Sequence, residues 1–151
     1  MRFRILRLTR QESALLLLAG SLVLTVRLAL WLLPSRVIIR RISRLVMPND
    51  LDGGKRTVSI GTIVWAVEAA SRRIPRATCL TQAVAAQLLL RCFGFGAQFC
   101  IGVAKQPDGG FRAHAWLERH GRPILGGSGI RSFTRLPDFR ADRQNPAPLG
   151  G

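Results

Sequence analysis

The chain has 151 residues, 48% of them hydrophobic, which suits one compact domain with a real core and at most an appendage. Lysine and arginine number 23 against 8 acidic residues, giving a net charge of +15, and all of these cations except Lys55 and Lys105 are arginine. Such a balance favours an acidic partner, a membrane surface or nucleic acid, although a GC-rich genome would enrich arginine equally.

Composition and spacing argue against several kinds of site. The arginines are spread along the chain, tyrosine is absent and no zinc-finger or RNA-binding aromatic motif occurs, so we expect no nucleic-acid partner. An odd set of cysteines at irregular spacing (Cys79, Cys92 and Cys100) is no disulfide framework and indicates a reducing compartment. Together with His114 and His120, these thiols match no zinc-ligand spacing, and we expect neither a metal nor a cofactor.

The N-terminal third predicts a long apolar helix. The run from Ala14 to Leu33 contains Arg27 as its one charged residue. A cleaved secretory signal would need a cleavage site of small residues after the apolar stretch that ends at Val26, and Arg27-Leu28-Ala29-Leu30-Trp31 is not one. A membrane span fits the length but would carry Arg27 in its last third. The third interpretation, which we favour, is a helix that packs a broad apolar face on the domain, with Arg10 and Arg27 at its polar edge.

Residues 35–47 predict a second helix that is amphipathic and basic. Aliphatic residues there alternate with Arg36, Arg40, Arg41 and Arg44. This helix either presents a solvated face, lies on an anionic membrane or receives an acidic partner. We therefore assign residues 1–48 to a helical region that packs on the domain or lies at a membrane surface.

Residues 56–137 form the predicted core domain, which begins with helices. Apolar residues recur at helical spacing from Val58 to Ser71, and Pro75 then interrupts the chain. Thr78 is a suitable N-cap for a helix over Cys79–Cys92, and Gly94 suits the left-handed residue that ends it. No charge occurs between Cys79 and Leu90, which is typical of a helix buried at the centre of a domain.

An antiparallel meander follows this helix. Residues 97–104 are strand-like, and residues 107–110 form a turn. In the second strand, Ala113, Ala115 and Leu117 alternate with His114 and Trp116, which share the other face. A turn at 120–121 leads into a third strand at 123–125. The pattern indicates an α+β fold, and the tail over residues 138–151 is expected to be poorly ordered.

Cys79 is the candidate nucleophile. A cysteine is commonly only a small buried hydrophobic residue. In the first turn of a helix, however, free N–H groups and the positive end of the helix dipole stabilise a thiolate, and the same groups can hold an oxyanion. Cys92 and Cys100 lack this setting, and we predict that both belong to the core.

His114 is the candidate base. It shares a strand face with Trp116, which could shield an ion pair from water, whereas His120 lies at a turn tip and is expected to be exposed. A thiol and an imidazole that folding brings together suffice for covalent attack on an acyl group.

These motifs carry a resemblance to a known family. The segments that carry it are Ala77-Thr78-Cys79-Leu80, Gln82-Ala83, Leu89-Leu90-Arg91 to Gly94, Ile101-Gly102-Val103, Ala113-His114-Ala115-Trp116-Leu117-Glu118 with Gly121, and the leucine-rich N-terminal stretch. In order and spacing they resemble the lasso-peptide leader peptidases, the peptidase part of the lasso-peptide maturation B protein. This family is a branch of the transglutaminase-like, papain-related cysteine enzymes.

The resemblance implies a fold, an activity and partners. The fold is a helix with the nucleophile packed on an antiparallel sheet with the base, and the activity is removal of the leader from a ribosomally made precursor peptide. The implied partners are this precursor, a separate precursor-recognition protein and an ATP-dependent cyclase. We expect a bacterial, cytoplasmic protein, with membrane association left open. A non-catalytic membrane-associated adaptor and a related acyl-transfer enzyme are the alternatives.

The sequence departs from the family pattern at the third catalytic position. The family usually has an aspartate about a dozen residues after the histidine, whereas this chain has Gly126-Gly127-Ser128 there. Glu118 is a poor substitute, because four residues along a strand span about 13 Å. Asp138, Ser128 or a backbone carbonyl could orient His114, and Asp138 is the nearest carboxylate downstream.

Overall fold

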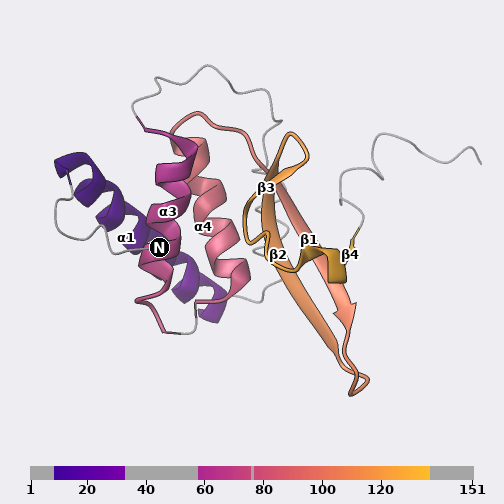
Figure 1. Cartoon of the computed structure of the whole chain (residues 1–151). Helices are drawn as coiled ribbons and strands as arrows, with labels where there is room; N and C mark the ends of the chain where they lie inside the picture. The colour runs from indigo at the N-terminus through magenta and orange to yellow at the C-terminus, as the bar shows by residue number, and fades with distance from the viewer. Residues whose placement is uncertain (1–8, 33–57, 76, 137–151) are drawn as a thin grey trace, which may run out of the picture.

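The computed structural model describes residues 9–32, 58–75 and 77–136, and in them the chain has an α+β fold of helices packed on an antiparallel sheet (Figure 1). The helices are α1 (Arg10–Leu32), α3 (Ile60–Ser71) and α4 (Cys79–Cys92). The strands are β1 (Gln98–Lys105), β2 (Phe111–Arg119), β3 (Arg122–Leu125) and β4 (Thr134–Arg135), with a short 3-10 helix at Ile130–Ser132. The basic helix predicted at 35–47 and the tail at 138–151 lie outside the described residues.

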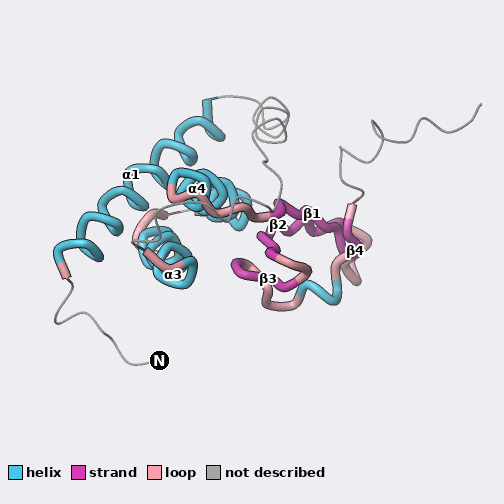
Figure 2. Tube along the Cα trace, turned by 90° about the horizontal axis from the view of Figure 1, so that it is seen from above, coloured by secondary structure: helices cyan, strands magenta, loops and turns pink. Residues whose placement is uncertain are grey.

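Helix α4 is the centre of the domain, as its lack of charge predicted. Its N-cap is Thr78, whose side chain accepts a hydrogen bond from the Thr81 N–H, and Gly94 follows its end with a φ of 76°. Most residues from Thr81 to Leu90 are buried. The helix contacts α1 and α3 and also the sheet, mainly β2, so it lies between the two layers (Figures 1 and 2).

Helix α1 packs on the other two helices along one stripe. Leu15, Ala19, Val23 and Val26 are its buried residues, and α1 contacts both α3 and α4. The opposite side of α1 is exposed although it is apolar. Among the described helices, α1 is the one that is long and apolar enough to cross a membrane.

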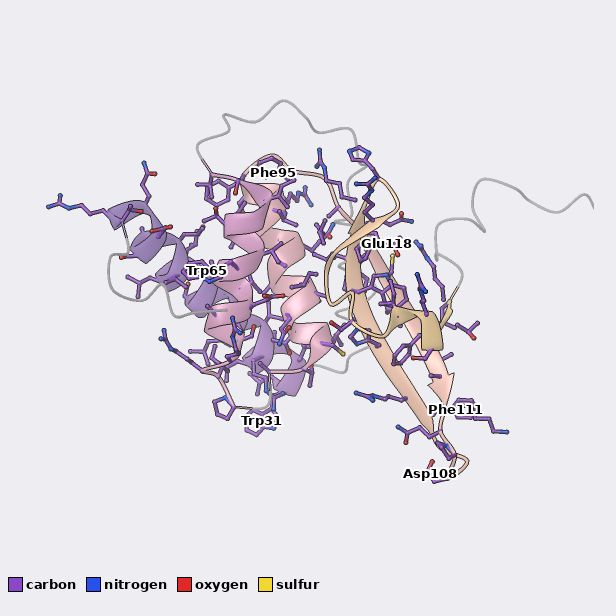
Figure 3. All side chains as sticks on the ribbon, viewed as in Figure 1. Trp31, Trp65, Phe95, Asp108, Phe111 and Glu118 are labelled. Atoms are coloured by element: carbon purple, nitrogen blue, oxygen red, sulfur yellow. The ribbon has the colours of Figure 1, made fainter. Side chains whose placement is uncertain are left out.

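The sheet has the strand order β3-β2-β1-β4, and all of its pairs are antiparallel. The predicted meander is therefore confirmed. Strand β4 was not predicted, because it consists of two residues that pair with Gly102 and Val103 of β1 and show no alternation of their own. Figure 3 shows Asp108 and Phe111 at the tip of the β1–β2 hairpin, which projects beyond the helices.

The two faces of the sheet have different coverings. Ala115, Leu117 and Leu125 belong to the hydrophobic core that the helices share. Cys100 and Trp116, which are register partners, are also buried, but on the opposite face. This face is covered by the chain after β3, since a Cβ at Gly126 would lie 3.2 Å from Trp116 Cβ.

One core prediction is wrong. Cys100 is buried as expected, but Cys92 is exposed. Cys92 is the last residue of α4 and lies one turn after Leu88, which is only half-buried, so it faces away from the packed side of the helix.

Candidate functional site

Cys79 is the first residue of α4 and is half-buried. The Thr78 hydroxyl holds the turn by accepting from the Thr81 N–H at 3.3 Å, and it lies 3.1 Å from the Thr81 hydroxyl. The first backbone bond of the helix runs from the Gln82 N–H to the Thr78 carbonyl. Within the described residues, the N–H groups of Cys79 and Leu80 donate to no acceptor. Both N–H groups lie at the N-terminal end of α4, which is the positive end of the helix dipole, next to the Cys79 thiol.

His114 lies in β2, opposite Gly102 of β1. Its Nε2 is 2.8 Å from the carbonyl oxygen of Gly126. Because a carbonyl only accepts, this hydrogen bond requires that Nε2 carries the proton. The Nδ1 atom of the neutral ring is then left with a lone pair, which can accept a proton.

Two aromatic rings fix the plane of the His114 ring. The Trp116 ring is stacked on it with centroids 6.0 Å apart and planes 20° apart, and the Phe133 ring lies 5.2 Å away at 36°. Gly102 makes room for this arrangement, since a Cβ there would lie 2.9 Å from both Phe133 Cβ and Trp116 Cη2. The absence of a side chain opposite His114 thus allows Phe133 to reach the sheet.

Glu118 holds this aromatic cluster but does not bond to His114. One carboxylate oxygen accepts from the Trp116 indole N–H at 2.8 Å, and the other accepts from Arg135 at 2.9 Å. Burial alone would raise the pKa of Glu118, but the Trp116 N–H and the Arg135 charge outweigh it, so the pKa is lowered. The ion pair joins β2 to β4 across the face of β1.

The helix that carries Cys79 packs against the strand that carries His114, and its N-terminal end faces the middle of β2 (Figure 1). Strand β3 pairs with β2 only from Leu117 to Arg119, so no described strand pairs with β2 at His114 on that side. No hydrogen bond joins the Cys79 and His114 side chains, both of which are described. The His114 ring lies with Trp116 on the face of β2 opposite Ala115 and Leu117, which belong to the core shared with the helices. The candidate site is therefore the open edge of β2 at His114, next to the N-terminal end of α4.

The other candidate residues lie away from this site or outside the residues that the structure describes. Asp138 lies outside the described residues. Ser128 is exposed and makes no hydrogen bond with His114, both being described, and His120 is exposed at the β2–β3 turn with a φ of 48°. No cluster of three side chains able to hold a metal ion occurs in the described ranges.

Of the residues that support His114, the sequence identified Trp116 on the same strand face and a backbone carbonyl only as a general option, whereas Phe133 was missed. A carbonyl has no side-chain signature, and the one signal for Gly126 was its place about a dozen residues after the histidine. Phe133 and Arg135 follow the last predicted strand and show no pattern that assigns them to the sheet.

The comparisons with known proteins bear on the same segment. No significant match was found among curated proteins or among solved structures. The family comparison matches residues 21–138, from the middle of α1 to beyond β4, to the Transglutaminase-like superfamily. Members of this superfamily are typically cysteine peptidases or transglutaminases, and the match covers well over half of the chain. The observed helix-on-sheet fold agrees with this match, and the chain belongs to the Transglutaminase-like superfamily.

Proposed function

We propose that this protein is a cysteine peptidase in which Cys79 is the nucleophile and His114 the base. One observation carries the proposal. His114 is held through Nε2 by the Gly126 carbonyl, which leaves Nδ1 as the basic atom, on the strand that packs against the Cys79 helix. A base whose second nitrogen is held keeps its tautomer and its direction.

The reaction proceeds in two acyl-transfer steps. His114 Nδ1 takes the thiol proton, and the Cys79 sulfur attacks the carbonyl carbon of the scissile peptide bond. The N–H groups of Cys79 and Leu80 hold the resulting oxyanion. The protonated His114 then gives its proton to the leaving amine, which departs as the new N-terminus. Water, deprotonated by His114, attacks the thioester, and the acid product and the free thiol are released.

A backbone carbonyl supports the imidazolium less than a carboxylate would. The Gly126 oxygen carries only a partial charge, whereas the aspartate usual in the resembling family carries a full one. We therefore propose that the Gly126 carbonyl sets the tautomer while contributing less transition-state stabilisation. Asp138 remains a candidate for additional support from outside the described residues.

The proposed substrate is the precursor of a lasso peptide, from which the enzyme removes the leader. This assignment rests on the resemblance of the Cys79 and His114 motifs to the leader peptidases. The proposed partners are a separate precursor-recognition protein, which delivers the leader, and an ATP-dependent cyclase, which uses the freed amine. All of these reactions belong to the bacterial cytoplasm.

A cleavage assay tests the proposal. The full chain is incubated with a lasso-peptide precursor and its recognition protein, and products are identified by mass spectrometry. Cleavage should stop in Cys79→Ala and His114→Ala but remain near wild type in His120→Asn, because asparagine tolerates the left-handed conformation of the exposed His120. Cleavage that persists in Cys79→Ala would end the proposal.

A second candidate function is a non-catalytic adaptor or an acyl-transfer enzyme. The favouring observation is that no carboxylate of the described residues bonds to His114, which is compatible with a weak or vestigial site. An adaptor would bind the precursor without cleaving it. An acyl-transfer enzyme would pass the Cys79 thioester to an added amine, and the amide product distinguishes it from a peptidase.

A further inference from the structure

The outer side of α1 is a continuous apolar surface. Its large exposed residues are Leu17, Leu18, Leu24, Leu28, Trp31 and Leu32. Leu17 is 77% exposed and Trp31 is 74% exposed, and the six residues together form an apolar patch rather than scattered single side chains. We call these six side chains the α1 outer face. They recur at helical spacing on the side opposite the buried stripe.

The hydroxyl groups on this side of α1 already donate hydrogen bonds to carbonyl groups of the same helix. The Ser21 hydroxyl donates to the Leu18 carbonyl at 2.9 Å, and the Thr25 hydroxyl donates to the Ser21 carbonyl at 2.8 Å. Arg27 is the one charged residue between Ala14 and Leu32, and it is only half-exposed. The α1 outer face, about 23 Å long at 1.5 Å per residue, therefore contains neither a charged residue nor a free hydroxyl.

The sequence next to α1 is strongly basic. Arg2, Arg4 and Arg7 precede the helix, and Arg36, Arg40, Arg41 and Arg44 follow it. Arginine beside an apolar helical face is typical of segments that bind anionic lipid surfaces. Trp31, in the last turn of α1, has the amphipathic ring that is enriched at membrane interfaces.

We propose that α1 docks the protein on an anionic lipid bilayer, lying in the plane of the surface with its outer face in the boundary of the acyl chains. A spanning orientation would expose Leu15, Ala19, Val23 and Val26 to lipid and remove them from α3 and α4. In-plane binding keeps that packing intact and buries only the six exposed side chains.

This orientation leaves the candidate site accessible. Figures 1 and 2 show α1 on the far side of α3 and α4 from the sheet. Figure 3 shows Trp31 at the margin of the helical layer, away from the hairpin with Phe111. A peptide can therefore approach β2 while α1 lies on the membrane.

Vesicle sedimentation tests the proposal with the full chain. It should co-sediment with phosphatidylglycerol vesicles at low salt, much less with phosphatidylcholine vesicles, and be released by carbonate. The double variant Leu24→Glu/Leu28→Glu should lose at least about tenfold in partitioning, since two leucines no longer enter the lipid. The matched control Phe111→Glu/Leu136→Glu changes the charge equally at exposed apolar residues elsewhere and should bind as wild type. Circular dichroism checks that both variants fold.

The fluorescence of Trp31 tests whether its side chain enters the lipid. Its emission should shift to the blue on binding and be quenched by brominated lipid. The variant Trp31→Phe should lose both signals but bind with an affinity within about threefold of wild type, because phenylalanine keeps the apolar contact.

Carbonate-resistant association would overturn in-plane docking in favour of a span. Loss of self-association in the leucine variant without vesicle binding would mean that a second copy covers the face. A Trp31 already shielded from acrylamide in buffer would mean that other residues of this chain cover it.

Discussion

His114 Nε2 and the carbonyl oxygen of Gly126 are 2.8 Å apart, and this hydrogen bond determines which ring nitrogen carries the proton. Gly126 can take this position because its φ is 71°, a conformation that glycine adopts without strain. The residue lies where the resembling family usually has an aspartate. In the proposed mechanism, this main-chain acceptor takes the role that the resembling family gives to a side chain.

We predict that Gly126→Ala lowers the cleavage rate, by less than the factor on the order of 10² that misplacing a catalytic group by about 1 Å costs. The new Cβ would lie 3.2 Å from the Ala115 carbonyl oxygen and from Trp116 Cβ, so a shift of a few tenths of an ångström is needed there, and it moves the carbonyl to which His114 bonds. Steady-state kinetics should show the loss mainly in kcat.

The matched control is Gly129→Ala. Gly129 also has a positive φ, 75°, but a Cβ there meets nothing within 4 Å. Both variants should lose about 1–2 kcal/mol of stability for the left-handed conformation, and Gly126→Ala somewhat more. If the two variants are equally active, the Gly126 carbonyl has no part in the cleavage reaction.

The cap of α4 gives a second prediction. Thr78→Ala removes the acceptor of the Thr81 N–H and should cost about 1 kcal/mol of stability. It should also lower the cleavage rate, because the first turn of α4 positions the Cys79 thiol. Ser59→Ala removes the equivalent acceptor from α3, where Ser59 accepts from the Thr62 N–H at 3.1 Å. It should match Thr78→Ala in urea unfolding and leave the cleavage rate unchanged. A similar rate loss in both variants would mean that stability alone accounts for the effect.

A third prediction concerns alkylation of the three thiols. Iodoacetamide should label Cys79 first, although Cys92 is the more exposed residue, because the proposed mechanism gives the Cys79 thiol a base in His114. Cys100 is 1% exposed and should react last. Peptide mass spectrometry gives the rate at each site, and labelling in denaturant supplies the control for intrinsic reactivity. Labelling of Cys92 ahead of Cys79 would show that exposure alone sets the order.

The fourth prediction is a pH dependence of stability from Glu118. Its pKa lies below the ordinary 4.5, because the Trp116 and Arg135 donors outweigh the effect of burial. A lowered folded-state pKa stabilises the protein at pH values above the unfolded-state pKa, and the contribution disappears as the pH falls through the folded-state value. Glu118→Gln should therefore be less stable than wild type at neutral pH, and the difference should shrink in acid.

Urea midpoints measured from neutral pH to below 4.5 check this dependence. Arg135→Gln should remove only part of it, since the hydrogen bond from the Trp116 N–H also lowers the pKa of Glu118 and remains in this variant. The effect of Arg135 is also limited because its side chain is 38% exposed. A difference between wild type and Glu118→Gln that stays constant with pH would exclude ionisation of Glu118 as its source.

The sequence by itself determined the elements that depend on local signals. Thr78 and Gly94 marked both ends of α4 because caps and left-handed residues have their own side-chain chemistry. The alternation of Ala113 to Leu117 likewise separated the two faces of β2, since successive strand residues point to opposite sides. The α+β class followed from these elements in order.

Only the tertiary structure decided the surroundings of His114 and the orientation of two helices. Every residue has a backbone carbonyl, so no pattern could assign that role to Gly126 among the candidates. A helix that is apolar on all sides has no preferred buried face, and packing on α3 and α4 selected the stripe with Ala19 and Val23. Cys92 is exposed for the same reason, because contacts between distant segments, rather than residue type, determine which side of a helix meets the core.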